Sequence, residues 1–541
     1  MSERITQIEL RIVGWLAAIV SIVSFLAFYQ RDQIMLSGDA VAHIGIARRV
    51  FDSLTPGPLQ LGTVWLPLQH LLILPFIVSD RLWRTGVGGS VPSLAGYVLA
   101  VAGVFRLARV GLEESDLRDQ AAAAAWFAAL LFALNPNLLY VQATALNESL
   151  YLAESAWAIG FFLDFTKWVR LEAWDAAAQA LRRCAVVLAA AILTRYDGWF
   201  LATICGSGLV LMIWRETPLR ASLRDAAPTR RAVTAFILLL ALTPALWLAY
   251  NYGVFHDPLE FARGPYSARA ILQRTTRPGD AFYPGYHSLG VAAMYFLKCA
   301  RLNVAEGRWE PWLLLLASAG TVIMVARRRW TWLLLWAPLP FYAISIAYGG
   351  VPIFIPTWWP FSFYNARYGL QLLPAIAVFS AISMAWVMRI TQRGRWGAVV
   401  PLTFVALVAG SYGSVWRAQP ICLREAVANS RTRIPYEKTL ADQLEVLPPG
   451  ATLLMFIGDH SDALRRAGIP LQRVLNESNY PVWQLALEDP AGHADYVVAM
   501  DGGPVAAAVQ KHRDGLESMV VITSLGQPRT TLYKSLAPTR R

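Results

Sequence analysis

The sequence predicts a mainly α-helical, polytopic membrane protein with a smaller α/β domain at its C-terminus. Of the 541 residues, 56% are hydrophobic and 16% are charged, which is too apolar for a soluble multi-domain enzyme. Long apolar runs alternate with short basic loops as far as Tyr412. Beyond Tyr412, charged and turn-forming residues become frequent and no run is long enough to span a bilayer. We therefore expect a membrane domain at 1–417 and a separate domain at 418–541.

The membrane domain is predicted to cross the bilayer eleven times. At about 1.5 Å per helical residue, some twenty apolar residues cover roughly 30 Å of hydrocarbon. The first run has no small-residue cleavage site after it and is expected to be a permanent anchor. The expected crossings are 11–29, 91–109, 121–140, 151–169, 183–194, 198–214, 232–252, 311–327, 331–348, 368–388 and 397–414.

The basic loops indicate the orientation of these crossings. With a cytoplasmic N-terminus, eleven crossings place all the strongly basic loops in the cytoplasm, as the positive-inside rule requires. These loops are 106–118, 167–183, 215–231, 327–329 and 389–395. The eleven-crossing topology requires that two short, interrupted apolar runs, 64–79 and 288–302, do not cross the membrane. They would lie on the outer face as juxtamembrane or re-entrant helices. If both crossed, the count would be thirteen and the central basic loops would face outward.

The net charge of +12 is accounted for by these loops, so the expected anionic partners are membrane lipids and not nucleic acid. We expect a multi-pass protein of the plasma (inner) membrane with its C-terminal domain outside the cytoplasm.

Four polar segments then meet the outer face of the membrane. Asp39 follows the first crossing in GDAVAHIGIAR, and Glu148 lies in the turn ATALNESLY. Arg195 and Asp197 belong to LTRYDGW, and Arg367 belongs to ARYGLQLLP. Ionisable side chains at a membrane edge are costly, so each needs a partner or a function. Pairing between helix ends is the simplest explanation, and for Arg195 with Asp197 it is the favoured one.

Taken in order, these segments resemble the motifs of the GT-C fold, the fold of polyprenol-dependent membrane glycosyltransferases that include protein O-mannosyltransferases and the lipid A aminoarabinose transferase. The matching stretches are GDAVAHIGIAR, TVWLPLQHLL (63–72), LNPNLLYVQATALNESLYL (134–152), LTRYDGW and ARYGLQLLP. The likeness extends over residues 10–415. This sequence has Asp39-Ala40 where the family has paired acids, and Leu66-Pro67 where it has two prolines.

The resemblance implies a hexosyl- or pentosyltransferase that takes a sugar from a polyprenyl-phosphate donor and passes it, with inversion, to an extracytoplasmic acceptor (lipid, glycan or protein). Asp39 would be the general base, although Asp is also a common helix N-cap. Arg367 would hold the leaving phosphate, although it is also suited to a salt bridge. Glu148, Arg195 and His70 would bind substrate.

A divalent metal is a further expectation at this site, and no other cofactor is indicated. Asp39 and His43 are four residues apart and would share one helix face. With Glu148 they would supply the mixed oxygen and nitrogen ligands that suit a Lewis-acid metal.

The alternative function is a transporter or flippase for a lipid-linked or anionic substrate. Two features count against it: no inverted repeat is visible, and the ionisable residues lie at the outer edge and not at mid-membrane.

The external loop 253–287, with Arg263, Arg269, Arg274 and Arg277, is expected to gate substrate entry.

The C-terminal domain is predicted to alternate strands and helices, with a role in acceptor recognition or in covering the catalytic face. The expected strands are 452–458, 494–500, 518–525 and 530–535, and the expected helices are 436–446, 460–467 and 503–513.

Overall fold

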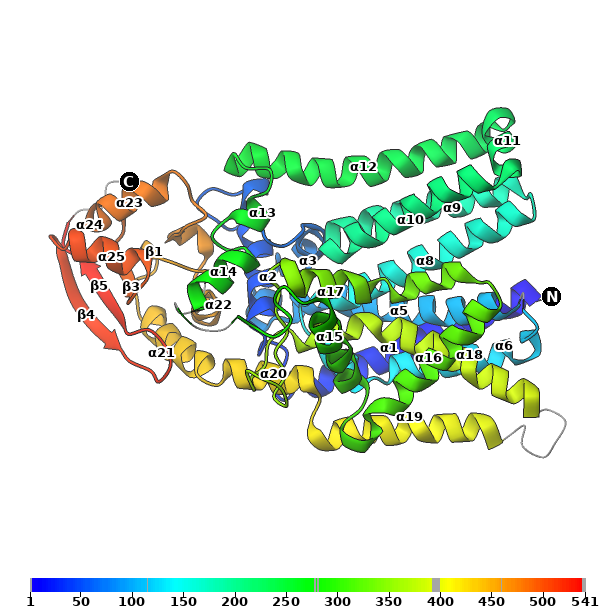
Figure 1. Ribbon diagram of the computed structural model, residues 1–541. Helices are drawn as coiled ribbons and strands as arrows, with labels where there is room; N and C mark the ends of the chain where they lie inside the picture. The colour runs from blue at the N-terminus through cyan, green and yellow to red at the C-terminus, as the bar shows by residue number, and fades with distance from the viewer. Residues whose placement is uncertain are drawn as a thin grey trace.

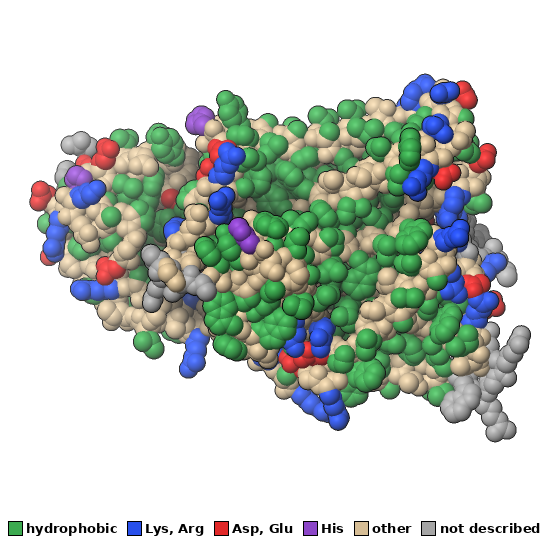
Figure 2. All heavy atoms as spheres, in the orientation of Figure 1, with side chains coloured by type: hydrophobic (Ala, Val, Ile, Leu, Met, Phe, Trp, Pro, Cys, Tyr) green, Lys and Arg blue, Asp and Glu red, His purple; other side chains and the backbone are tan. Residues whose placement is uncertain are grey.

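The computed structural model describes residues 2–113, 115–276, 279, 282–391, 399–458 and 460–537. A bundle of long helices carries a small sheet domain at one end, and the N-terminus lies at the other end (Figure 1). Hydrophobic side chains cover the sides of the bundle, and many Lys and Arg side chains lie at the end away from the sheet domain (Figure 2). This is the surface expected of an integral, multi-pass membrane protein.

Within the described residues, eight helices are long and apolar enough to cross a membrane. They are α1 (Ser2–Tyr29), α5 (Val87–Glu113), α9 (Trp174–Thr194), α10 (Tyr196–Arg215), α12 (Ala227–Phe255), α16 (Glu310–Ala326), α18 (Leu373–Thr391) and α19 (Val399–Ala418). The last three reach span length together with the short helices that adjoin them, as Gly307–Ala326, Ala366–Thr391 and Val399–Ser430. A ninth span results if η4 (Trp330–Trp336) and α17 (Pro338–Tyr348), bent by 44°, are counted together.

The other two predicted crossings correspond to α6 and α8. α6 (Ala121–Ala133) stops short of the predicted 121–140 because Asn135 and Pro136 start a new helix, α7 (Pro136–Val141), whose first turn is capped by the Asn135 side chain. α8 (Glu148–Arg170) packs along α5 and α9 for most of its length.

The two segments predicted not to cross form shorter helices. Residues 64–79 give α3 (Leu68–Ile77), and residues 288–302 give α15 (Leu289–Val304). Neither is among the helices long enough to span. α2 (Gly38–Arg49) and α3 lie at the end of the bundle that carries the sheet domain, whereas α11 (Thr217–Asp225), in a predicted basic loop, lies at the opposite end (Figure 1). Residues 392–398 of the last basic loop lie outside the described residues.

Two glycines allow close approaches that set the positions of polar segments. A Cβ on Gly96 of α5 would come within 2.7 Å of the Leu150 backbone, so this glycine lets the start of α8 pack directly on α5. A Cβ on Gly369, in the 3₁₀ helix η5 (Ala366–Leu372), would come within 2.7 Å of the Ala300 backbone nitrogen on α15. The two close contacts fix the positions of Glu148, two residues before Leu150, and of Arg367, two residues before Gly369.

The C-terminal domain contains a five-stranded sheet of order β2-β1-β3-β5-β4. Its first three strands are parallel and the last two pairings are antiparallel. The strands are β1 (Leu453–Met455), β2 (Val474–Leu475), β3 (Tyr496–Met500), β4 (Leu516–Ile522) and β5 (Thr530–Ser535). Only the two-residue β2 was not predicted, because its pattern is too short to be distinguished.

Helices complete this domain and connect it to the bundle. They are α20 (Ile421–Ser430), α21 (Arg433–Glu445), α22 (Asp462–Ala467), α23 (Val482–Glu488), α24 (Pro490–His493) and α25 (Pro504–Lys511). The domain also contacts the segment between α2 and α3: Asn479 donates to the hydroxyls of Ser53 and Thr55, and the Gln472 backbone N–H donates to Asp52. The sheet domain therefore lies over the end of the bundle where the predicted polar segments gather.

Candidate active site

Asp39 stands in the first turn of α2, close to where the chain leaves α1. Ser37, and not Asp39, occupies the N-cap position of α2, so the carboxylate of Asp39 is not the helix cap. It instead accepts a hydrogen bond from Nη2 of Arg367, which lies more than three hundred residues away in the sequence. With 38% of its side chain exposed, Asp39 is accessible to solvent.

Glu148 bridges the two predicted arginines. Its Oε1 accepts from Nε of Arg367 at 2.8 Å and from Nη1 of Arg195 at 3.2 Å. The Glu148 side chain is only 1% exposed, and its Oε2 is buried without a hydrogen-bond partner. A buried carboxylate is stable only when cations compensate it, and here two guanidinium groups do so.

Arg195 lies at the break between α9 and α10 and is held on every side. It donates to Asp197 at 3.1 Å, to the Asn147 side chain at 2.9 Å and to the Tyr342 hydroxyl at 2.8 Å. Tyr342 in turn donates to Asp197 at 3.1 Å. Arg195 and Asp197 therefore pair as predicted, but the pair belongs to a larger network.

The network, here called the outer cluster, contains Asp39, Glu148, Arg195, Asp197 and Arg367. Its three carboxylates and two guanidiniums come from four segments that are far apart in the sequence. The Tyr368 ring lies beside both guanidiniums, 5.1 Å from Arg195 and 5.2 Å from Arg367. Nη1 of Arg367 has no hydrogen bond to any described residue, so this arginine retains a donor for a ligand.

His70 is not in the outer cluster. Its Nε2 lies 2.8 Å from Nδ1 of His43, and both side chains are buried. Burial, together with the positive charges of Arg367 and Arg195, lowers the pKa of His43 from 6.5 to about 3. Burial also lowers the pKa of His70 well below its usual value. The pair is therefore neutral and ties α2 to α3.

The predicted metal ligands do not converge. Asp39 and Glu148 both face Arg367, while His43 faces His70. In the part of the chain that the structure describes, no group of three or more His, Cys, Asp or Glu side chains is placed to hold a metal ion. These residues do not fit a metal in this arrangement, and metal binding remains a prediction.

Glu425 is a residue that sequence reasoning missed. It lies on α20, and both of its carboxylate oxygens accept backbone N–H groups, from Asn365 at 2.9 Å and Ala366 at 2.7 Å. These groups open η5, which carries Arg367, so Glu425 fixes the position of that arginine. No motif marks Glu425 in the sequence, because its partner is backbone and not side chain.

The loop predicted to gate the site forms two short helices, α13 (Glu260–Arg263) and α14 (Ala268–Thr275). Arg263 lies 3.9 Å from Asp257, and Arg274 donates to the Pro265 carbonyl at 2.6 Å. Arg277 lies outside the described residues. The gating role remains a prediction.

Comparison with known proteins extends these observations. No family model matches the chain, and no curated protein matches its sequence. Solved structures do match. ArnT from Cupriavidus metallidurans bound to undecaprenyl phosphate superposes with a TM-score of 0.56 at 14% identity, covering 98% of this chain and 99% of that one. The same protein in the apo state gives a TM-score of 0.53 at 14% identity over the same shares.

The archaeal oligosaccharyltransferase AglB from Archaeoglobus fulgidus, in complex with an inhibitory peptide and a dolichol-phosphate, gives a TM-score of 0.51 at 16% identity. The match covers 91% of this chain and 69% of the AglB chain. The ArnT match extends over nearly the whole of both chains, including the sheet domain. The chain therefore has the GT-C fold, as its ordered motifs predict.

Proposed function

We propose that the protein is a membrane glycosyltransferase that moves a hexosyl or pentosyl group from a polyprenyl phosphate to a hydroxyl of an acceptor outside the cytoplasm. The observation that carries the proposal is the outer cluster, because it joins an accessible carboxylate to two guanidinium groups at one end of the membrane bundle. A carboxylate and a phosphate-binding cation are the two groups that this transfer needs. Solved structures of the same fold contain undecaprenyl phosphate or dolichol-phosphate.

Arg367 is proposed to hold the donor phosphate. Its guanidinium presents a planar pair of donors to phosphate oxygens, and its Nη1 has no hydrogen bond to the residues that the structure describes. A phosphate arriving at Arg367 would compete with Asp39, since both are anions binding the same group. Donor binding would thus release the Asp39 carboxylate next to the anomeric carbon.

The released Asp39 is proposed to act as the general base. The acceptor oxygen attacks the anomeric carbon as its proton passes to the Asp39 carboxylate. The bond between that carbon and the phosphate oxygen breaks on the opposite face, so the configuration inverts. Polyprenyl phosphate leaves as an anion stabilised by Arg367, with the positive charge of Arg195 behind it.

Glu148 is proposed to orient both arginines and to bind the sugar. Its Oε2 is a buried acceptor without a partner, which is costly unless a donor reaches it. A sugar hydroxyl is a donor of the right kind. The transporter alternative has no comparable support, because the charged groups of the outer cluster lie together at one end of the bundle and not along a central path.

The experiment is transfer of radiolabelled sugar from a panel of polyprenyl-phosphate sugars, in membranes that contain the full chain or its variants. Asp39→Asn removes the proposed base. The matched control is Asp80→Asn, since Asp80 also lies in the first turn of a short helix, α4 (Asp80–Thr85), and pairs with an arginine, Arg48. We expect about a thousandfold loss of transfer or more for Asp39→Asn and less than about threefold for Asp80→Asn. Equal activities of the two folded variants would refute the base assignment.

A further inference from the structure

The backbone of Ala366, the residue before Arg367, is held through both of its polar groups. Its N–H donates to the Glu425 carboxylate on α20 at 2.7 Å. Its carbonyl accepts from Nδ2 of Asn303 at 2.7 Å and from Sγ of Cys299 at 2.9 Å, both on α15. Two helices therefore fix the peptide groups on either side of Ala366, one through the N–H and one through the carbonyl.

Asn303 is the centre of a buried hydrogen-bond network. Its side chain is 0% exposed, and Nδ2 also donates to the Cys299 carbonyl at 2.9 Å. Its Oδ1 accepts from Sγ of Cys422 at 3.3 Å. Its backbone carbonyl accepts from the side chains of Asn135 at 2.9 Å and Asn137 at 3.1 Å. A buried polar network in which each member is bonded holds its groups rigidly.

The network joins four segments that are far apart in the sequence. Asn135 and Asn137 belong to the start of α7, on either side of Pro136. Oδ1 of Asn137 also accepts from the Cys422 backbone N–H at 2.9 Å, which ties α7 to α20. With α15 and η5, these helices meet at the side chain of Asn303. The two asparagines beside Pro136 thus support η5, which contains Arg367.

The start of η5 needs this support. Asn365, the residue before Ala366, has a φ of 58°, in the left-handed region that a non-glycine residue keeps only when its surroundings hold it. A Cβ on Gly369 would come within 2.7 Å of Nδ2 of Asn303, so the glycine lets η5 lie directly against this amide. The short 3₁₀ helix is thereby fixed at its first residue and again one turn later.

We propose that Asn303 is a positioning residue for Arg367 and, through it, for the donor phosphate. By holding the Ala366 carbonyl, Asn303 sets the direction in which the Arg367 side chain leaves the backbone. That direction places the guanidinium against both Asp39 and Glu148. The phosphate part of this inference rests on the proposed function, whereas the placement of Arg367 can be measured without it.

The test compares two asparagine variants of the purified full chain in detergent. Asn303→Asp keeps the shape of the side chain, removes both N–H donors and sets an acceptor against the Ala366 carbonyl. The matched control is Asn251→Asp, because Asn251 on α12 is also 0% exposed and also donates to a backbone carbonyl, that of Trp247 at 2.8 Å. Asn303→Ala and Asn251→Ala repeat the comparison without added charge, and gel filtration confirms folding.

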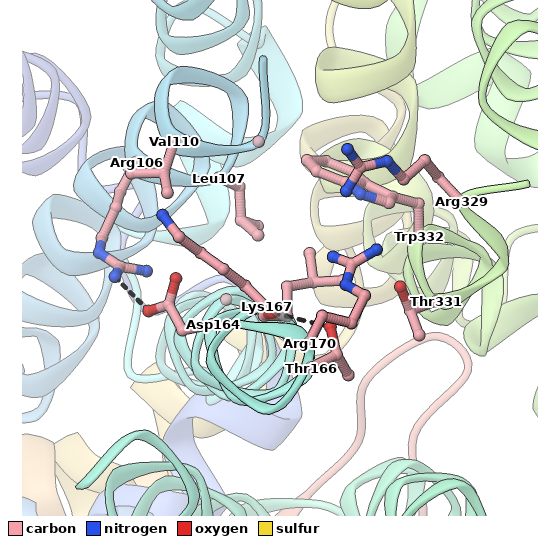
Figure 3. Close-up of a pocket in the computed structure, with 13 residues that line it drawn as sticks. Arg106, Leu107, Val110, Asp164, Thr166, Lys167, Arg170, Arg329, Thr331 and Trp332 are labelled. Carbon is pink, nitrogen blue, oxygen red and sulfur yellow. Dashed lines mark hydrogen bonds and ion pairs between the residues drawn. The ribbon is translucent and has the colours of Figure 1, made fainter. Parts of the chain in front are cut away.

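The first measurement is the rate at which phenylglyoxal modifies individual arginines, followed by mass spectrometry without any substrate. Arg106 is the internal reference, since it pairs with Asp164 in a pocket at the opposite end of the bundle (Figure 3). Its side chain is 21% exposed, against 13% for Arg367. We expect Asn303→Asp to speed the modification of Arg367 by about tenfold or more and that of Arg106 by less than about twofold. Equal rates at Arg367 in the Asn303 and Asn251 variants would overturn the positioning role.

The second measurement is binding of undecaprenyl phosphate to the same proteins. Asn303→Asp should weaken binding by about tenfold or more, and Asn251→Asp by less than about twofold. Binding that Asn303→Asp leaves unchanged would overturn the proposal, because Asn303 would then be structural only. A wild-type protein that does not bind undecaprenyl phosphate would overturn the phosphate part together with the proposed function. The modification rates would still decide whether Asn303 places Arg367.

Discussion

Two carboxylates at opposite ends of the helix bundle are each shared by two arginines, and the two arrangements differ in burial. Near the sheet domain, Glu148 joins Arg195 and Arg367 and is 1% exposed. At the opposite end, Asp116 joins Arg327 and Arg389 and is 41% exposed. The same chemical motif is thus built once inside the protein and once at its surface. Because water and salt weaken the exposed set, only the buried set is expected to govern stability and function.

The largest difference should appear when the shared carboxylate is neutralised. Glu148→Gln leaves two buried guanidiniums short of compensation, and we expect it to lower the free energy of unfolding by about 3–5 kcal/mol. Asp116→Asn should cost less than about 1 kcal/mol. Thermal unfolding of both variants in the same detergent measures the contrast. Similar losses would mean that burial does not distinguish the two ends.

A second prediction concerns acid, which should first destabilise the end of the bundle that holds the outer cluster. The pKa of His43 is lowered from 6.5 to about 3, so the unfolded chain takes up a proton below about pH 6.5 while the folded chain does not. His43 therefore contributes full stability above pH 6.5, and that contribution falls as the pH drops toward 3. The loss is about 2 kcal/mol between pH 6.5 and about pH 5.

Melting curves across this range test the sign. His43→Asn, whose amide can still reach His70, should flatten the pH dependence. His512→Asn, at an exposed position in the sheet domain, should leave it unchanged. A wild-type protein that becomes more stable as the pH falls from 6.5 to 5 would contradict the assignment of a neutral buried His43.

A smaller effect is expected for Tyr342→Phe. This change removes the hydroxyl that donates to Asp197 and accepts from Arg195, and hydrogen bonds to charged groups contribute about 1.5–3 kcal/mol. Because Arg195 keeps its other partners, we expect a net loss of about 1–2 kcal/mol. Thermal unfolding measures it, with Tyr252→Phe, at a 62% exposed position, as the control. No loss in either variant would show that the Tyr342 hydroxyl is not part of the buried network.

The smallest effect is the response to salt. Raising the ionic strength from about 0.1 to 1 M shortens the distance over which exposed charges interact to a few ångströms. The stability difference between wild type and Asp116→Asn should therefore shrink toward zero, whereas the difference for Glu148→Gln should persist. Unfolding measured at both salt concentrations gives the comparison. A Glu148 contribution that disappears in salt would contradict its isolation from solvent.

The sequence predicts the outer cluster well because its members belong to motifs at helix ends. Asp39, Glu148, Arg195 and Arg367 each follow or precede a long apolar run, so topology alone brings them to one end. Their mutual pairing adds Tyr342 and Asn147, which no pattern distinguishes from other polar residues. Glu425 was missed for a different reason, since it acts on backbone N–H groups from a helix assigned to the other domain.

The remaining differences between prediction and structure also have physical causes. His70 was grouped with the substrate-binding residues, and among the described residues its Nε2 lies 2.8 Å from Nδ1 of His43; its role in substrate binding stays a prediction. The predicted crossing 121–140 is divided because Pro136 cannot donate the backbone hydrogen bond that would continue α6.

The comparison of the two ends predicts that the outer cluster, and not the exposed set around Asp116, binds a polyprenyl phosphate. The most direct measurement is binding of undecaprenyl phosphate to the purified full chain, compared between Arg367→Gln and Arg327→Gln, with folding checked by gel filtration. Each change removes one of two arginines from a shared carboxylate, at opposite ends of the bundle. We predict that Arg367→Gln weakens binding by about tenfold or more and that Arg327→Gln changes it by less than about twofold. Equal binding by both folded variants would contradict the account.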